Sequence, residues 1–146
     1  MDSRGALSGD FVLSILITII ISLGLLSVIS DRMDLTQETE KISQSRLLTE
    51  KIASSINNIQ NHKGKEIIYK MPESIGNSSN YVVSVNSTGV YIDIDKIKGK
   101  SEIYPVVIVN ELNSTIEVNM YPGKSYLIRN NPSNNHKKTI SIIEVN

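Results

Sequence analysis

The feature that most constrains this chain is an apolar run at residues 11–29, "FVLSILITIIISLGLLSVI", which holds no charged residue. As an α-helix this run would be about 28 Å long at 1.5 Å per residue, which is close to the hydrocarbon thickness of a bilayer. The run therefore predicts a transmembrane segment. A secretory signal would have a shorter apolar region and small residues before its cleavage site, and Val28 and Ser30 match that pattern only marginally.

Three hydroxyl side chains interrupt the apolar run. Ser14, Thr18 and Ser22 recur every four residues and so lie along one face of a helix. A face of small residues allows the backbone of a neighbouring helix to approach closely. Alternatively, each hydroxyl bonds the backbone carbonyl four residues earlier and needs no partner helix. The sequence leaves both interpretations open.

The helix has no reason to end where the apolar run ends, because no Gly or Pro occurs from Asp31 to Asn61. Six apolar residues in this region share one side of a helical wheel, which indicates a face packed against a core. They are Leu35, Ile42, Leu48, Ile52, Ile56 and Ile59. The segment "NHKG" at residues 61–64 then resembles a helix end, with cationic residues before a Gly. We predict one long helix over residues 6–62, transmembrane first and amphipathic afterwards.

From residue 65 onward the apolar residues recur at every second position, as they do in β-strands. Residues 81–94 alternate on both sides of Ser87, Thr88 and Gly89, which predicts a β-hairpin closed at these three residues. Further strands are predicted at residues 106–109, 115–120, 125–129 and 139–145, with turn residues between them. The prediction is an α+β fold, in which an antiparallel sheet or sandwich of about six or seven strands spans residues 65–146. The apolar stripe of the helix would cover the inner face of the sheet.

Composition excludes several classes of function. Lys and Arg together number 15, as do Asp and Glu, so no net charge attracts nucleic acid. The chain has no Cys and therefore no disulfide or thiolate metal site. Neither a glycine-rich phosphate loop nor a catalytic triad occurs, so we expect no enzyme, cofactor or metal. Asp93 and Asp95 lack the spacing of a calcium loop, and we interpret them as outward-facing strand residues.

Three N-glycosylation sequons begin at Asn77, Asn86 and Asn113, all in predicted turns. Their number alone proves little, because a chain so rich in Asn, Ser and Thr would contain about as many by chance. They are candidate glycan sites only if the β-rich half lies outside the cell.

The residues before the apolar run carry a resemblance. "RGALSGDFVL" at residues 4–13 resembles the class III signal peptide of archaeal type IV pilin precursors. In that family a short leader ends in a basic residue and Gly, here Arg4 and Gly5, and the mature chain has Ser third and an acid fifth, here Ser8 and Asp10. Two positions depart from the family: Ala6 stands where Gln is commonest, and Asp10 replaces the usual Glu. The order of membrane helix, amphipathic helix and β-rich half also resembles the pilin plan.

This resemblance implies a leader of residues 1–5, removed after Gly5 by a membrane prepilin peptidase. The new amine of Ala6 would lie near Asp10 at a helix start, whose dipole favours an anion. In pilins the acid of one subunit is thought to meet the mature amine of a neighbour during assembly, and this role would fall to Asp10 and Ala6, with Ser8 beside them. Without the resemblance, Asp10 is an interfacial residue favoured by the same dipole.

The resemblance further implies a structural subunit, a major or minor pilin, of an adhesive surface filament. Its partners would be copies of itself or other pilins through the N-terminal helices, membrane lipid, the prepilin peptidase, an assembly ATPase and its membrane platform. The protein would occupy the cell membrane and then an extracellular filament. The alternative is a single-pass, membrane-anchored extracytoplasmic binding or accessory protein that does not assemble. A secreted enzyme or inhibitor, cut after Ser30, is a third interpretation.

Overall fold

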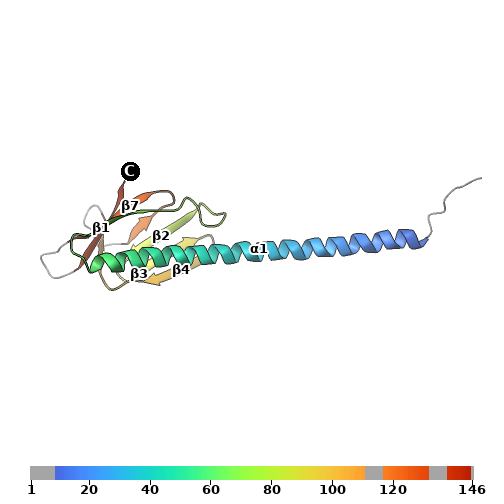
Figure 1. Ribbon diagram of the computed structural model, residues 1–146, viewed down its shortest axis with the longest axis horizontal. Coiled ribbons are helices and arrows are strands. Elements are labelled where there is room, and N and C mark those ends of the chain that lie inside the picture. Colours follow the sequence, from blue (N-terminus) through green and yellow to red (C-terminus); the bar gives the residue numbers. More distant parts are fainter. Residues whose placement is uncertain (1–8, 111–116, 132–137, 146) are drawn as a thin grey trace, which may run out of the picture. The chain divides into compact units, whose positions relative to one another are not determined.

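The computed structural model describes residues 9–110, 117–131 and 138–145. Within them, one helix precedes eight strands (Figure 1). The elements are α1 (Gly9–Gln60), β1 (Glu66–Lys70), β2 (Tyr81–Asn86), β3 (Gly89–Ile94), β4 (Ile97–Glu102), β5 (Val107–Val109), β6 (Val118–Met120), β7 (Ser125–Asn131) and β8 (Thr139–Val145). The predicted α+β fold and its single long helix are confirmed. Contacts divide the chain into two units between Glu38 and Thr39, and α1 runs through this boundary.

The second unit, Thr39–Asn146, is called the β unit below. It contains two four-stranded sheets, ordered β1-β7-β8-β5 and β4-β3-β2-β6. Five of the six strand pairs are antiparallel, as predicted. The sixth pair, β5 and β8, is parallel, with Val107 opposite Thr139 and Val109 opposite Ser141. The prediction of a purely antiparallel sheet is therefore wrong at this edge. A long connection containing β6 and β7 separates the two strands, and parallel pairing requires a crossover of this kind.

The predicted hairpin at residues 81–94 is confirmed in position and register. Tyr81 lies opposite Ile94, and Val85 opposite Val90, so the alternating apolar residues of both strands share one face. The turn itself is shorter than predicted, because Gly89 already pairs with Asn86. Ser87 and Thr88 alone form the connection, which is the commonest hairpin loop length.

Two strands had not been predicted, β1 and β4. Both lie at sheet edges, and β4 alternates the charged residues Lys98, Lys100 and Glu102 with partly buried ones. Charged residues on an edge strand protect it from pairing with other chains, but they also remove the apolar signal on which sequence prediction depends. Three predicted strands have different bounds: β5 and β6 are shorter, and β7 extends to Asn131. Residues 115 and 116 of the strand predicted at 115–120 lie outside the described residues.

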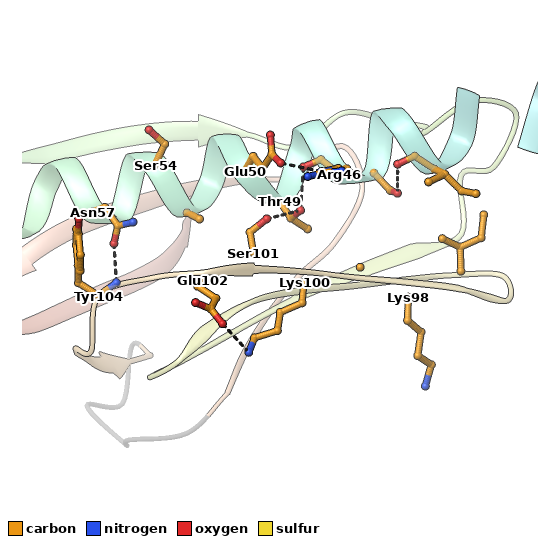
Figure 2. Close-up of a pocket in the computed structure, with 15 residues that line it drawn as sticks. Arg46, Thr49, Glu50, Ser54, Asn57, Lys98, Lys100, Ser101, Glu102 and Tyr104 are labelled. Carbon is orange, nitrogen blue, oxygen red and sulfur yellow. Dashed lines mark hydrogen bonds and ion pairs between the residues drawn. The ribbon is translucent and has the colours of Figure 1, made fainter. Parts of the chain in front are cut away.

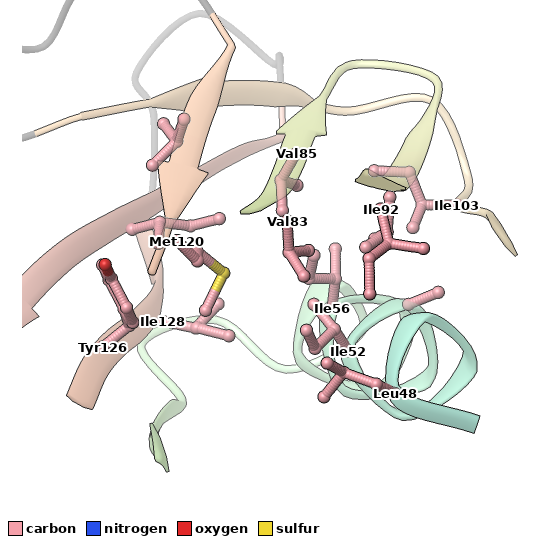
Figure 3. Close-up of a cluster of buried hydrophobic side chains, with 14 of the residues drawn as sticks. Leu48, Ile52, Ile56, Val83, Val85, Ile92, Ile103, Met120, Tyr126 and Ile128 are labelled. Carbon is pink, nitrogen blue, oxygen red and sulfur yellow. The ribbon is translucent and has the colours of Figure 1, made fainter. Parts of the chain in front are cut away.

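The core forms where α1 meets the strands. Ile52 and Ile56 are fully buried and point from α1 toward Val83 and Ile92 (Figure 3). Burying one such side chain contributes about 1.5–3 kcal/mol. The predicted stripe is thus confirmed over its second part, where Leu48 and Ile59 are also buried. Its first part is not buried, because Leu35 is 59% and Ile42 47% exposed.

The helix ends at Gln60, two residues before the predicted end, and its last turn contains no basic residue. The cation–Gly signal at residues 61–64 therefore follows the helix instead of closing it. Gly64 adopts φ 73, a left-handed conformation that suits Gly after a helix. The buried side chain of Asn130 on β7 donates to the last carbonyls of the helix, those of Ile59 at 2.9 Å and Gln60 at 3.3 Å, and to the carbonyl of His62 just beyond the helix at 3.1 Å.

Candidate functional site

The first candidate site is the apolar part of α1. Fourteen large apolar side chains between Phe11 and Ile29 are exposed, from 46% at Ile15 to 62% at Leu26. The mean hydropathy of an 18-residue window here reaches 2.8, and no part of that window is buried within the protein. By length and composition this part of the helix can cross a membrane or act as a signal.

Two hydroxyls inside the apolar segment are bonded within the helix. Ser14 Oγ donates to the Asp10 carbonyl at 2.7 Å, and Thr18 Oγ1 to the Ser14 carbonyl at 2.8 Å. This is the second of the two interpretations left open by the sequence. The bonds let a polar side chain enter a bilayer without a partner helix.

Of the residues predicted to act in processing and assembly, the structure describes only Asp10. It lies in the first turn of α1 and is exposed, where the helix dipole favours its carboxylate. No Lys, Arg or His among the described residues forms an ion pair with it. Gly5, Ala6 and Ser8 lie outside the described residues, so the predicted cleavage site has no structural account.

The second candidate site is a groove of about 670 Å³ between α1 and β4 (Figure 2). Its floor is a close approach of small side chains, where Ser101 Oγ donates to Thr49 Oγ1 at 2.9 Å. Gly99, also on β4, lies opposite Ile92 of β3, and a Cβ there would lie 2.9 Å from Ile92 Cγ2. Asn57 closes one end of the groove by accepting the backbone N–H of Tyr104 at 2.9 Å.

The polar groups of this groove bond one another. Arg46 pairs with Glu50 at 2.9 Å, and Lys100 lies 3.5 Å from Glu102. Among the described residues that line the groove, no histidine lies beside the Ser101 and Thr49 hydroxyls to act as a base. Across residues 9–110, 117–131 and 138–145, no group of three or more His, Cys, Asp or Glu side chains is placed to hold a metal ion. The described residues of the groove thus present a surface of hydrogen-bonded polar side chains.

A contact near residue 41 was not predicted from the sequence. Lys41 Nζ on α1 lies 2.7 Å from Asp95 Oδ2, and Gln44 Oε1 accepts the backbone N–H of Gly76 at 2.7 Å. The hydrogen bond from Lys41 holds the pKa of the Asp95 carboxyl below its usual value. Asp95 has φ 53 in the turn between β3 and β4, so its interpretation as an outward-facing strand residue is wrong. The polar dipeptide Asp95-Lys96, between the apolar residues Ile94 and Ile97, was the turn signal available in the sequence.

Two of the three sequons fall on described residues. Asn86 ends β2, and its sequon forms the hairpin turn. Asn77 lies in a bend between Ile75 and Ser78, which form an isolated β-bridge. Asn113 lies outside the described residues.

No protein-family model, no curated protein and no solved structure matches the chain. The architecture is nevertheless pilin-like, since a long apolar N-terminal helix is followed by a β-sheet domain.

Proposed function

We propose that the chain is a structural subunit, a major or minor pilin, of an archaeal type IV pilus-like filament that attaches cells to surfaces. A prepilin peptidase would cleave it after Gly5. The assembly ATPase and membrane platform would then move the mature subunit from the membrane into the filament. The protein would thus occupy the cell membrane first and the cell surface afterwards.

The observation that carries this proposal is the exposure of the apolar part of α1. Fourteen exposed large apolar side chains on one helix form a surface far larger than the apolar patches that soluble monomers present to water. Such a surface must be covered by lipid, by the apolar faces of neighbouring helices, or first by one and then by the other. The pilin plan supplies both, because the same segment spans the membrane before assembly and lines the filament core afterwards.

Asp10, the part of the predicted assembly site that the structure describes, is compatible with a helix that moves from the membrane into a filament core. Asp10 has a carboxylate at the helix start and no cationic partner among the described residues. A charge that enters an apolar helix bundle requires a counter-charge. The amine created on Ala6 of a neighbouring subunit would supply it, with Ser8 adjoining the pair.

One observation favours the alternative, a membrane-anchored extracytoplasmic accessory protein that does not assemble. The hydroxyls of Ser14 and Thr18 are bonded within α1, so this segment can remain in lipid without contacting another helix. In that case the β unit would stay near the membrane permanently, and Asp10 would be an interfacial residue.

Shearing of intact cells separates the two candidates. Filaments released by shearing would be sedimented, and the β unit would be detected in the pellet and in the cell membranes with an antibody. The pilin proposal expects the chain in the sheared filaments as well as in the membranes. Retention of all of the chain in the membranes would favour the accessory protein.

A further inference from the structure

A second groove, of about 560 Å³, lies between α1 and the chain from Tyr69 to Ile75. Its lining is largely apolar. Met71 and Ile75 are buried beneath it, whereas Leu47 on α1 also lines it and is 53% exposed. An apolar groove along a helix is the shape into which the apolar face of another helix fits.

Two lysines lie toward one end of this groove. Lys51 and Lys70 are exposed, and neither forms an ion pair among the described residues. The chain returns to the groove from the C-terminal end of α1, so Lys70 lies nearer to Lys51. Gly76 follows at the other end, where its backbone N–H donates to Gln44 at 2.7 Å. Since Glu73 is the one acid among the described lining residues, the groove is basic as well as apolar.

A face of α1 with the opposite charge precedes the β unit. Asp31, Leu35 and Glu38 are spaced four and three residues apart, so they share one side of the helix. Leu35 is 59% exposed, and neither acid forms an ion pair within the described part of the chain. Asp34 and Glu40 add further negative charge, against the single cation Arg32 in residues 31–40. This segment is therefore acidic and partly apolar.

The acidic face and the basic groove cannot meet within one chain. Both lie along the same continuous helix, where Leu35 precedes Leu47 by 12 residues, about 18 Å at 1.5 Å per residue. They can meet between two copies. Two unlike surfaces that complement each other form a heterologous contact, and a heterologous contact that does not close into a ring grows into an open filament.

We propose that the helix face of residues 31–38 in one copy docks in the groove of a second copy. Leu35 then packs beside Leu47, and Glu38 lies beside the two lysines of the groove. Burial removes the apolar side chains from water, and the acid and the lysines gain partners of opposite charge. The inference rests on the proposed function and names a contact of the filament outside the apolar segment of α1.

This contact requires one copy to be displaced along the helix direction. When parallel helices place Leu35 of one copy beside Leu47 of the other, the two copies are about 18 Å out of register. Copies at equal depth in a membrane have no such displacement. The contact therefore forms when one copy has moved outward, and it distinguishes assembled subunits from membrane-resident ones.

The test is disulfide cross-linking, which is direct because the chain has no Cys. A chain with both Leu35→Cys and Leu47→Cys cannot close a disulfide on itself, since bonded cysteines have Cα atoms within about 7 Å. Sheared filaments of this variant would be oxidised, denatured and separated on a non-reducing gel. We expect a ladder of multimers, because each copy supplies one surface and receives the other. Monomers alone, or dimers without larger species, would overturn the inference.

Matched controls exclude unselective oxidation. Met33 is 57% exposed and lies on the opposite side of the helix from Leu35, so Met33→Cys combined with Leu47→Cys should remain monomeric. Each of Leu35→Cys and Leu47→Cys alone should also remain monomeric. The Leu35→Cys, Leu47→Cys chain should give no ladder in the membranes of cells that lack the assembly ATPase. An equal ladder in any of these samples would contradict the docking or its displacement.

Charge reversal tests the contact without cysteines. Glu38→Lys and Lys51→Glu each bring like charges together, so each should lower sheared filament protein by about tenfold or more while membrane protein is unchanged. The combined variant restores opposite charges and should recover filaments. Lys96→Glu reverses an exposed lysine that does not line the groove and should have no effect. Failure of the combined variant to recover would contradict the pairing.

The two proposals fail in different ways. Normal filaments in which the Leu35→Cys, Leu47→Cys chain gives no ladder overturn the groove contact and leave the pilin proposal in place. Absence of the unaltered chain from sheared material overturns the pilin proposal, and the groove contact with it.

Discussion

The side-chain amide of Asn130 donates to the backbone carbonyl of Ile59 at 2.9 Å, although 71 residues separate the two in sequence. The same amide reaches the carbonyls of Gln60 and His62. The last carbonyls of a helix have no partner within the helix. Here the Ile59 carbonyl also accepts the backbone N–H of His62, and the His62 carbonyl accepts that of Lys65. One side chain of β7 therefore holds the end of the long helix and the connection that leads to β1.

Replacing Asn130 should destabilise the β unit. Asn130→Ala removes the donor to the Gln60 carbonyl and one of two donors to each of the carbonyls of Ile59 and His62, which costs about 1–3 kcal/mol of unfolding free energy. Asn130→Asp should cost more, because a carboxylate has no donor and carries its charge to the negative end of the helix dipole. Urea unfolding of the full chain in detergent, followed by circular dichroism, measures both. The neighbouring variant Asn131→Ala is the control, and an equal loss there would contradict the account.

Core packing predicts a contrast between two positions on α1. Ile52 is fully buried, whereas Leu47 is 53% exposed. Ile52→Ala should lower the unfolding free energy by about 2–5 kcal/mol, as buried truncations do. Leu47→Ala should change it by less than about 0.5 kcal/mol. If the same urea titrations gave similar losses for both variants, the assigned helix face would be wrong.

Tyr81 links stability to alkaline pH. Burial raises its pKa to about 12, with smaller contributions from Tyr69 and Tyr126. Between the ordinary tyrosine pKa of 10 and this value the unfolded chain binds fewer protons than the folded chain. Stability is therefore fully present below pH 10 and falls as pH rises toward 12. Burial also raises the pKa of Tyr69 and Tyr126. Absorbance titration of tyrosinate should therefore lose the amplitude of one tyrosine near pH 12 in Tyr81→Phe and keep it in Tyr104→Phe. An unchanged amplitude near pH 12 in Tyr81→Phe would contradict this assignment.

Asp10 should matter for assembly and not for folding. Asp10→Ala leaves the amine of a neighbouring Ala6 unpaired in an apolar bundle, so filament yield should fall at least tenfold, the equivalent of about 1.4 kcal/mol. Asp10→Glu keeps the charge and should retain filaments. Sheared filament protein per cell, measured against membrane protein, is the readout. Equal yields from Asp10→Ala and the unaltered chain would leave Asp10 without an assembly role.

Local signals predicted much of the fold, and tertiary contacts decided the rest. The β2-β3 hairpin was predictable because both strands alternate around a short polar turn. Strand β4 was not, since its partly buried positions include the small residues Gly99, which lies against Ile92 of β3, and Ser101, which bonds Thr49 of α1. The parallel pairing of β5 with β8 also has no local signal, because it joins residues far apart in the chain.

Among the candidate sites, too, some have a local sequence signal and others depend on tertiary contacts. Asp10 could be singled out because its distance from Gly5 and from the apolar run is a property of the sequence itself. The ion pair of Lys41 with Asp95 could not, because 54 residues separate the partners and folding alone brings them together.

The central claim is that this chain is cut after Gly5 and then leaves the membrane in a filament. The most direct measurement is the mass of the N-terminal peptide of the native protein, taken from cell membranes and from material sheared off the cell surface. The account predicts a start at Ala6 in the sheared material. A chain that retains Met1 and occurs only in membranes would contradict it.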